Sequence, residues 1–435
     1  MTDLQLAGAG LVILILLLLA RVPIAVALGA VSFAGIWLVI GPTSAWGILT
    51  AVPYEVIASW SLSSVPMFLL MGYVCYHAKL TDGLFEMARL WLSRLPGGLA
   101  VASIGAAAGF STVTGSSVAC AAAIGRIAVP EMLRAGYDKG LAAGICAAAG
   151  TIGSMIPPSI LLLLYGLFVE APIGPLFLAG FLPGILTALM YSTVIVGRVK
   201  INPALARPVT EHPSWRDRIA VLGKTGPTIL LVIGVFGGLF AGFFTPTEAG
   251  AVGAMLAILL AVARRTLTWR AALAAFEETL VTTSAIFIIA IGANLLTRFL
   301  ALAGFTDWLG DTVGALQLGQ AALLVAISVV YLFLGCFLDP LGIMLLTLPI
   351  LMPLVEGANI DLIWFGILVV KLLEIGLITP PVGLNVFVLK GVVGNLMTSE
   401  ALFRGVAWFI AADIVTMALL IAFPEISLLL PRLLQ

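Results

Sequence analysis

The apolar segment 141–165 is interrupted near its middle by residues that disrupt helices. The interrupting residues are Gly150, Thr151, Gly153, Ser154, Pro157, Pro158 and Ser159. Proline removes a backbone donor and clashes with the preceding helical turn, so we expect the helix to break here. In a membrane, open backbone is tolerated only where it lies against protein or lines a cavity. The segment therefore predicts a broken membrane helix whose hydroxyls and free carbonyls bind a small ion or solute.

A second interrupted apolar segment, 362–389, lies late in the chain. Its interruption contains Thr379, Pro380, Pro381, Gly383 and Asn385. Adding 223 to positions 157 and 158 gives 380 and 381, so the two double prolines are related by one offset. The same offset relates Pro23 to Pro246, Trp46 to Trp269 and Pro130 to Pro353. Because the chain has only 23 prolines and 9 tryptophans, this agreement predicts two copies of one unit.

The composition places the chain in a membrane. Of its 435 residues, 62% are hydrophobic and 10% are charged, whereas soluble domains carry roughly 25% charged residues. Apolar stretches long enough to span a bilayer include 4–20, 24–40, 227–244, 249–263, 286–305 and 406–423. The net charge of zero argues against a nucleic-acid partner. The sequence contains no phosphate-binding loop, which argues against ATP-driven transport by this chain. The four cysteines are isolated in apolar stretches, which indicates packing and neither metal binding nor redox chemistry.

These features predict an all-α polytopic membrane protein built from two inverted repeats. The first repeat spans 1–197, with a re-entrant helical hairpin at 99–125 and a broken transmembrane helix at 141–165. A polar linker, 198–226, leads to the second repeat at 227–435, with its hairpin at 320–354 and its broken helix at 362–389. We expect the hairpins and broken helices to form a transport domain that moves like an elevator against a scaffold. The Trp-bearing segments 44–60 and 267–283 are expected to belong to that scaffold as interface helices.

The middle of the first hairpin is rich in hydroxyl groups. The stretch FSTVTGSSVA, 110–119, brings hydroxyls and bare carbonyls to one turn, which suits a hard monovalent cation. Close helix packing by small residues is an equal alternative. Adding 223 to Ser116 gives Asp339, so the second hairpin carries a carboxylate at the same position. A charged Asp at the membrane centre costs at least roughly 2.5 to 3.5 kcal/mol, which favours a functional role.

Other polar residues in apolar segments could bind solute, form ion pairs or cap helices. Asn294 and Arg298 lie one turn apart and could together hold a carboxylate, or Arg298 could extend its side chain to the membrane surface. Lys371 and Glu374 have the spacing of an ion pair within one helix. Glu248 follows Thr245 with the spacing of a capping box, which predicts a helix start.

Several motifs together resemble a known family, the large membrane subunit of tripartite ATP-independent periplasmic (TRAP) transporters. They are SSVPMFLLMG from Ser63, TGSSVACAAAIG from Thr114, MIPPSILLLLYG from Met155, FTPTEAGAVGA from Phe244 and LEIGLITPPVGLNVFVLKG from Leu373. The resemblance covers nearly the whole chain apart from the linker and both ends. It implies a DctM-type subunit of the ion transporter superfamily, in a bacterial inner membrane.

The resemblance also implies the site residues. The first sodium site would comprise Thr114, Gly115, Ser116, Ser117, Gly150, Thr151, Gly153, Ser154, Pro157 and Ser159. The second would comprise Gly335, Cys336, Asp339, Thr379, Pro380 and Gly383. Solute would lie between them. The residues that we expect to bind the solute are Ser116, Ser117, Asn294, Arg298 and Asn385, of which Asn294 and Arg298 are chosen for their spacing and not for the resemblance. Sodium is the only metal implied, as the coupling ion, and no organic cofactor is implied.

The implied function is sodium-driven uptake of a carboxylate-bearing solute, such as sialic acid or a four-carbon dicarboxylate. The implied partners are a small membrane subunit and a periplasmic binding protein. A self-sufficient ion-coupled carboxylate symporter of the same superfamily is the alternative, and a passive channel is a weaker one. No nucleophile, base or metal cluster indicates an enzyme.

Overall fold

The computed structural model describes residues 2–206, 214–316, 318–394 and 397–433, and these residues form helices with no strand among them. The helices up to residue 206 are α1 Asp3–Leu19, α2 Ile24–Ile40, α3 Pro42–Ile57, η1 Ser61–Ser63, α4 Ser64–His77, α5 Gly83–Leu92, α6 Gly98–Thr114, α7 Ser117–Arg134, α8 Lys139–Gly150, η2 Thr151–Ser154, α9 Ile160–Val169, α10 Ile173–Ile201 and η3 Pro203–Leu205. Those after residue 213 are α11 Trp215–Phe240, α12 Pro246–Ala263, α13 Trp269–Leu302, α14 Phe305–Ala315, α15 Gln320–Gly335, α16 Pro340–Gly357, α17 Leu362–Gly376, α18 Leu384–Val393, α19 Ser399–Ala422 and α20 Glu425–Leu433.

The apolar runs of the sequence become helices of membrane-spanning length. Within the described ranges, six helices are long and apolar enough to cross a bilayer, or seven if the bent pair α3 and η1–α4 counts as one span. The bend between the members of that pair is 56°. The expected all-α class is confirmed by these helices.

Local sequence signals explain where many helices begin. Thr245 and Glu248 form the capping box that the spacing predicts, with both reciprocal hydrogen bonds present at the start of α12. Ser214 and Asp217 form another at the start of α11. Such caps satisfy the free N–H groups of the first turn, so each helix has a defined first residue.

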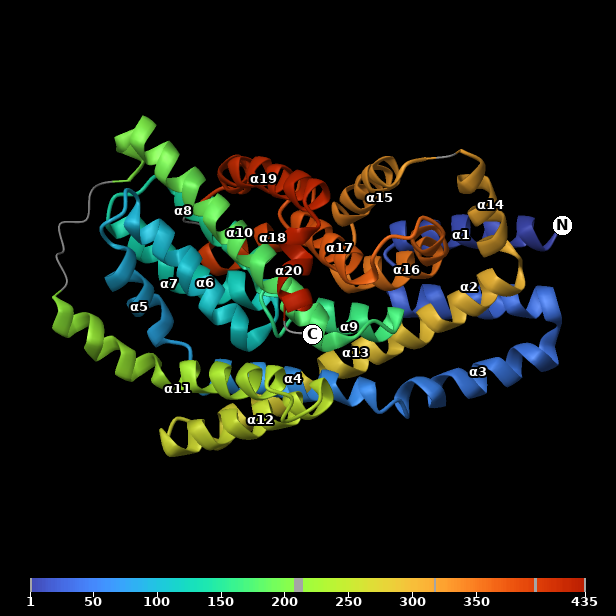
Figure 1. Cartoon of the computed structure of the whole chain (residues 1–435), viewed down its shortest axis with the longest axis horizontal. Coiled ribbons are helices and arrows are strands. Elements are labelled where there is room, and N and C mark those ends of the chain that lie inside the picture. The colour runs from blue at the N-terminus through green and yellow to red at the C-terminus, as the bar shows by residue number, and fades with distance from the viewer. Residues whose placement is uncertain (1, 207–213, 317, 395–396, 434–435) are drawn as a thin grey trace.

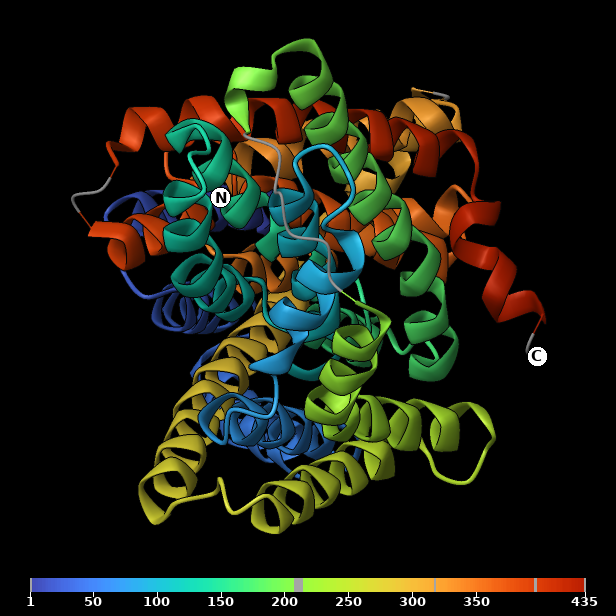
Figure 2. The same ribbon diagram turned by 90° about the vertical axis from the view of Figure 1, so that its left-hand side faces the viewer.

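The helices are arranged in two layers (Figures 1 and 2). A lower layer contains α3, α4, α11 and α12, and α13 runs along it toward the hairpins above. Helix α13 contacts α2 and α4, and α12 contacts α4, so this layer is continuous. The segment 267–283 is not a separate interface helix as expected, because α13 continues through it for 34 residues.

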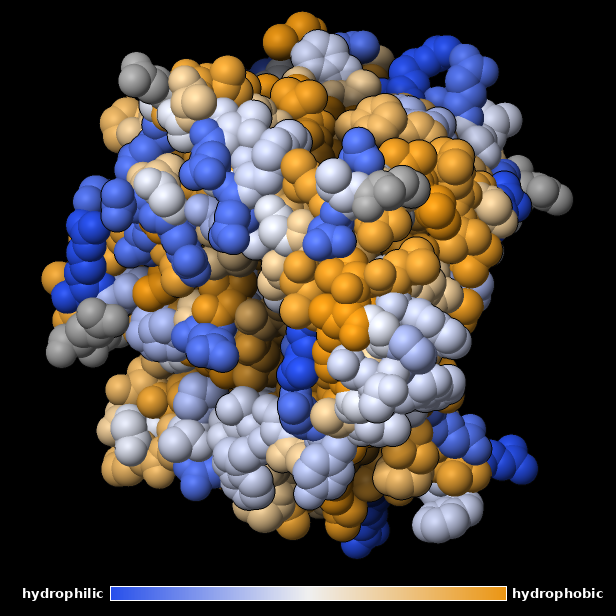
Figure 3. Space-filling model, turned by 90° about the vertical axis from the view of Figure 1, so that its right-hand side faces the viewer, coloured by the Kyte–Doolittle hydropathy of each residue, from blue (hydrophilic) through white to orange (hydrophobic). Residues whose placement is uncertain are grey.

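The outer surface is largely apolar. Figure 3 shows broad apolar areas on one face, with polar residues gathered in patches between them. Exposed side chains on α1 include Leu16 and Leu19, and those on α15 include Val329 and Phe333. Soluble monomers rarely expose apolar areas of this extent, so the surface fits a lipid environment.

The two halves of the chain contain similar elements in the same order. Each contains a helical hairpin, α6–α7 or α15–α16, followed by a helix with a break, α8–η2–α9 or α17–α18. The described residues between the halves are few, since α10 continues to Ile201 and α11 begins at Trp215. Residues 207–213 of the expected linker lie outside the described residues. The repeat and its inversion stay predictions.

Helices α8 and α19 cross at a contact between glycines. A Cβ atom added to Gly405 would lie 1.9 Å from the carbonyl oxygen of Gly140, and one added to Gly144 would lie 2.4 Å from the backbone of Gly405. Only hydrogen atoms fit between the two backbones. This crossing fixes α8, which leads into the first break, against α19.

We expect Gly405→Ala to lower the melting temperature of the detergent-purified chain by several degrees, because overpacking costs about 1 to 3 kcal/mol. Gly197→Ala is the matched control: Gly197 lies in α10 with no atom within 4 Å of an added Cβ. That variant should melt at or slightly above the wild-type temperature, since alanine favours helix. Equal melting temperatures for the two variants would contradict the packing described for α8 and α19.

Candidate functional site

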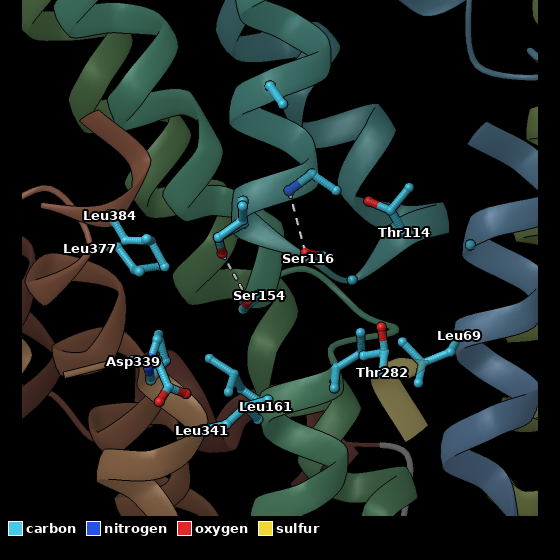
Figure 4. A pocket seen from close by; sticks show the side chains of 18 of the residues that line it. Leu69, Thr114, Ser116, Ser154, Leu161, Thr282, Asp339, Leu341, Leu377 and Leu384 are labelled. Atoms are coloured by element: carbon cyan, nitrogen blue, oxygen red, sulfur yellow. Dashed lines mark hydrogen bonds between the residues drawn. The ribbon is translucent and has the colours of Figure 1, made fainter. Parts of the chain in front are cut away.

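A cavity of about 410 Å³ lies between the lower layer and the turns of both hairpins. From the lower layer it is lined by residues of α4 and α13, including Tyr73 and Thr282, whose hydroxyls are 2.9 Å apart. In Figure 4, Thr114 and Ser116 lie on one side of the cavity and Asp339 on the other, with Ser154 between them. Cavities of this size accommodate small-molecule ligands.

The turn of the first hairpin packs directly on the first break. Gly115 has a φ of +60°, and a Cβ there would lie 2.2 Å from the carbonyl oxygen of Pro158, so glycine is required on both counts. Ser116 follows as the N-cap of α7, accepting from the backbone N–H of Ala119 at 3.4 Å. The hydroxyl-rich turn and the double proline are therefore in contact.

The first break is entirely buried. One 3-10 turn, η2, follows α8, and Ser159 caps α9 by accepting from the Leu162 N–H at 3.1 Å. An added Cβ on Gly153 would lie 2.9 Å from the backbone nitrogen of Ser117, and one on Gly150 would lie 2.9 Å from its carbonyl oxygen. The structure thus brings together the residues expected at the first sodium site; their role in ion binding stays a prediction.

A carboxylate from the second half reaches this cluster. The Ser117 hydroxyl lies 2.7 and 2.6 Å from the two carboxylate oxygens of Glu374, and 2.8 Å from the hydroxyl of Ser154. Glu374 is completely buried. The hydroxyl has one proton, so it can donate to only one of these oxygens at a time. Four oxygen atoms converge here, from the first hairpin, the first break and α17.

The expected pairing of Lys371 with Glu374 is wrong. The Lys371 ammonium lies 2.5 Å from Asp413 on α19 and 3.2 Å from the Thr187 hydroxyl. Glu374 has no ion-pair partner among the described residues. The spacing within one helix could not reveal Asp413, although an acidic residue inside the apolar run 406–423 was itself a signal.

The second hairpin turn repeats the cap of the first. Asp339 is the N-cap of α16 and accepts from the Gly342 N–H at 3.0 Å. Ser116 and Ala119 plus 223 give 339 and 342, so the two caps occupy related positions. Asp339 also lines the cavity, together with Glu374. Asp339 is therefore not the sole carboxylate at this cavity.

The second break is more open than the first. Gly335 and Gly376 are in contact, since a Cβ on Gly335 would lie 2.9 Å from the Cα of Gly376. Thr379 donates to the Ile375 carbonyl, and Gly383, with a φ of +59°, is the N-cap residue before α18. Pro380 is exposed and Cys336 is half-buried. Of the residues expected at the second sodium site, only Asp339 lines the cavity.

The residues expected to bind solute are divided between different places. Ser116 and Ser117 line the cavity. Asn385 is buried, and its amide nitrogen lies 3.4 Å from the carbonyl oxygen of Ala147 in α8, the helix that precedes the first break. Arg298 pairs with Glu55 of α3. Asn294 donates to the Ala290 carbonyl and lines a separate cavity of about 670 Å³. The structure thus brings neither Asn294 nor Arg298 to the hairpin turns.

The electrostatics of the cavity combine two opposite features. Its described lining includes the carboxylates of Glu278, Asp339 and Glu374 and no Lys or Arg side chain. It also includes the first residues of α7, α9, α16 and α18. Helix N-termini carry partial positive charge and favour anions, whereas buried carboxylates favour cations. The cavity can therefore hold a small anion and a cation close together.

Comparison with known proteins identifies the family. Residues 11–426 match the family described as "Tripartite ATP-independent periplasmic transporter, DctM component". The chain belongs to this family. The TRAP resemblance seen in the sequence is thereby confirmed, and the chain is a member of a family of multi-pass membrane permeases.

Several curated TRAP permeases are similar to this chain. One is the C4-dicarboxylate TRAP transporter large permease protein DctM of Pseudomonas aeruginosa, 36% identical, with 87% of this chain and 88% of that protein covered. The sialic acid large permease SiaM of Vibrio cholerae is 32% identical, with 87% of each covered. The isethionate permease DctMQ of Oleidesulfovibrio alaskensis is 32% identical over 87% of this chain and 59% of its own length.

The fold also resembles a solved transporter. The YdaH transporter of Alcanivorax borkumensis superposes with a TM-score of 0.60 at 13% identity, with 88% of this chain and 89% of that chain covered. At this identity the likeness concerns the fold alone. The TRAP permease and YdaH therefore share their overall fold.

We expect Glu374→Gln to reduce uptake at least about tenfold in proteoliposomes, because a lost charge-assisted contact is worth roughly 1.5 to 3 kcal/mol. The variant keeps the size and the hydrogen-bonding oxygen of the side chain. Glu400→Gln is the matched control, since Glu400 is exposed and its ion-pair partner among the described residues is Arg404 on the same helix. Wild-type uptake by Glu374→Gln at equal protein content would contradict a role for this carboxylate.

Proposed function

We propose that this chain is the transport subunit of a sodium-coupled secondary transporter. It imports a carboxylate-bearing solute across a bacterial inner membrane, together with a small membrane subunit and a periplasmic binding protein that delivers the solute. Family membership supports the class of transporter. The cavity that joins four helix N-termini to a buried carboxylate is the observation that carries the proposal.

The chemistry of the cavity supports both substrates. Hydroxyl and carboxylate oxygens are suitable ligands for sodium, a hard monovalent cation. Sodium beside Glu374 would offset the negative charge that otherwise opposes a carboxylate solute. The helix N-termini would then bind the solute through backbone N–H groups. Coupling follows, because each ion makes the site more favourable for the other.

The relatives support a small organic anion as the solute. Their names give C4-dicarboxylate, sialic acid and isethionate. All three compounds are anions, two of them with carboxylate groups. These names supply the probes with which uptake by this chain should be examined.

The position of the cavity supports an elevator movement of two inverted repeats. One wall belongs to α4 and α13, and the other to the hairpins and broken helices. Movement of the second group past the first would carry the polar site from one side of the membrane to the other. The scaffold in this proposal is the lower layer of Figure 1 with α13.

The test is uptake by proteoliposomes containing this chain, its small subunit and its binding protein. Labelled C4-dicarboxylate, sialic acid and isethionate are each supplied with an inward sodium gradient, a potassium gradient or a proton gradient. We expect saturable uptake of at least one solute that requires the sodium gradient and is unaffected by ATP. Full uptake with potassium, or with a proton gradient alone, would overturn the sodium assignment.

The same experiment separates the alternatives. Sodium-driven uptake in the absence of the binding protein would favour the self-sufficient symporter. Non-saturable, sodium-independent flux down the solute gradient would favour a passive channel.

A further inference from the structure

A buried polar network connects the first break to the last helices of the chain. The Lys371 ammonium lies 2.5 Å from one carboxylate oxygen of Asp413, and both side chains have no exposed surface. The Tyr191 hydroxyl donates to the other oxygen at 2.6 Å. It lies 2.8 Å from the hydroxyl of Thr151 in η2. The contacts therefore join α17, α19, α10 and the break.

The hydrogen bonds of this network have a defined direction. Tyr191 has one hydroxyl proton, and the Asp413 carboxylate accepts it. Thr151 must then donate either to the Tyr191 oxygen or to the Ala148 carbonyl, 2.7 Å away. The Tyr191 ring is held edge-on against Phe409 and lies 5.7 Å from the Lys371 ammonium. Tyr191 thus has one orientation, and its oxygen is one of the two acceptors within reach of the Thr151 hydroxyl.

A contribution to folding stability is not a sufficient reason for this buried network. A buried ion pair often contributes no more than apolar residues of the same volume, because desolvation offsets the attraction. The pair is, however, placed next to the candidate cation site. Glu374 follows Lys371 by one helical turn and contacts Ser117, which contacts Ser154 at the other end of η2.

The contacts thereby enclose η2 from both ends. One end is held at Thr151 by Tyr191, Asp413 and Lys371. The other end is held at Ser154 through Ser117 and Glu374. Helix α17 connects the two sets of contacts, because it carries both Lys371 and Glu374. Together these contacts form a closed circuit around η2. Thr151 plus 223 gives 374, so the offset of 223 relates Thr151 in η2 to Glu374 in the last turn of α17.

We propose that Tyr191, Asp413 and Lys371 are positioning residues for the cation site at the first break. They hold η2 so that its hydroxyls and carbonyls stay within reach of an ion beside Ser117 and Glu374. The inference rests on the proposed sodium coupling. It adds three residues that do not line the cavity.

The readout is sodium-dependent thermal stabilisation of the full-length chain purified in detergent, with potassium chloride at equal ionic strength as the reference. A ligand that binds the folded state stabilises it by RT ln(1 + [L]/Kd), so a fit of melting temperature against sodium concentration gives the concentration at which half of the sites are occupied, the midpoint sodium concentration. We expect Tyr191→Phe to raise the midpoint sodium concentration roughly three- to tenfold, the effect of losing one buried hydrogen bond. The ring and its contact with Phe409 are retained.

Tyr331→Phe is the matched control. Tyr331 is also completely buried, and its hydroxyl has a single threonine partner, Thr347, on the neighbouring helix of the second hairpin. It lies outside the circuit around η2. Its removal should leave the sodium midpoint at the wild-type value, whatever it does to the melting temperature without sodium.

Two double variants separate positioning from charge burial. Lys371→Met with Asp413→Asn is neutral and retains an oxygen that accepts from Tyr191, so it should keep the wild-type midpoint. Lys371→Met with Asp413→Leu is equally neutral but lacks that acceptor, so its midpoint should shift as in Tyr191→Phe. A purely structural role predicts the same midpoint for both. This pair decides the question even if Tyr191→Phe does not fold.

The failures are distinguishable. If the wild-type chain shows no stabilisation by sodium beyond that by potassium, the proposed sodium coupling fails and the inference fails with it. If the wild type responds but Tyr191→Phe and the Met–Leu double variant keep its midpoint, only the positioning role is overturned.

Discussion

The structure depends on one buried carboxylate placed among neutral oxygens. Glu374 contacts the Ser117 hydroxyl and has no ion-pair partner in the described parts of the chain, while Lys371 one turn earlier is committed to Asp413. A carboxylate in this setting is costly unless a cation or a proton accompanies it. The surrounding fold therefore has to give a cation or a proton access to the Glu374 carboxylate. The breaks, hairpin turns and cavity all meet at that place.

Open backbone at this depth is possible because other parts of the protein cover it. Gly115 brings the first hairpin turn against Pro158, and Gly153 lies against Ser117, so the break contacts protein on each side. The side chains of Ser116, Ser159 and Asp339 cap the helices that begin beside the cavity. The second break, by contrast, leaves Pro380 exposed, so the two halves are not equivalent in this conformation.

The sequence could predict elements whose causes are local. The span 24–40 is an uninterrupted apolar run and forms a helix of those bounds, and the Glu248 capping box forms as its spacing requires. It could not predict partners that lie far apart in the chain. The spacing of Lys371 and Glu374 favoured a pair within one helix, but Asp413, 42 residues away, provides the partner because α19 packs beside α17. Likewise, the sequence suggested that Arg298 could bind solute, because it showed no partner for this side chain. In the structure Glu55 on α3 forms an ion pair with Arg298.

Direct binding of labelled sodium to the purified chain tests the central claim, that the oxygens around Glu374 form a cation site. Scintillation measurements with the radioactive isotope, displaced by unlabelled sodium or by potassium, would determine both affinity and selectivity. We expect saturable binding of the label, which sodium displaces much better than potassium. The double variant Ser117→Ala with Ser154→Ala should weaken this binding by at least about tenfold. The absence of saturable binding to the folded chain, or binding unchanged in that double variant, would contradict the central claim.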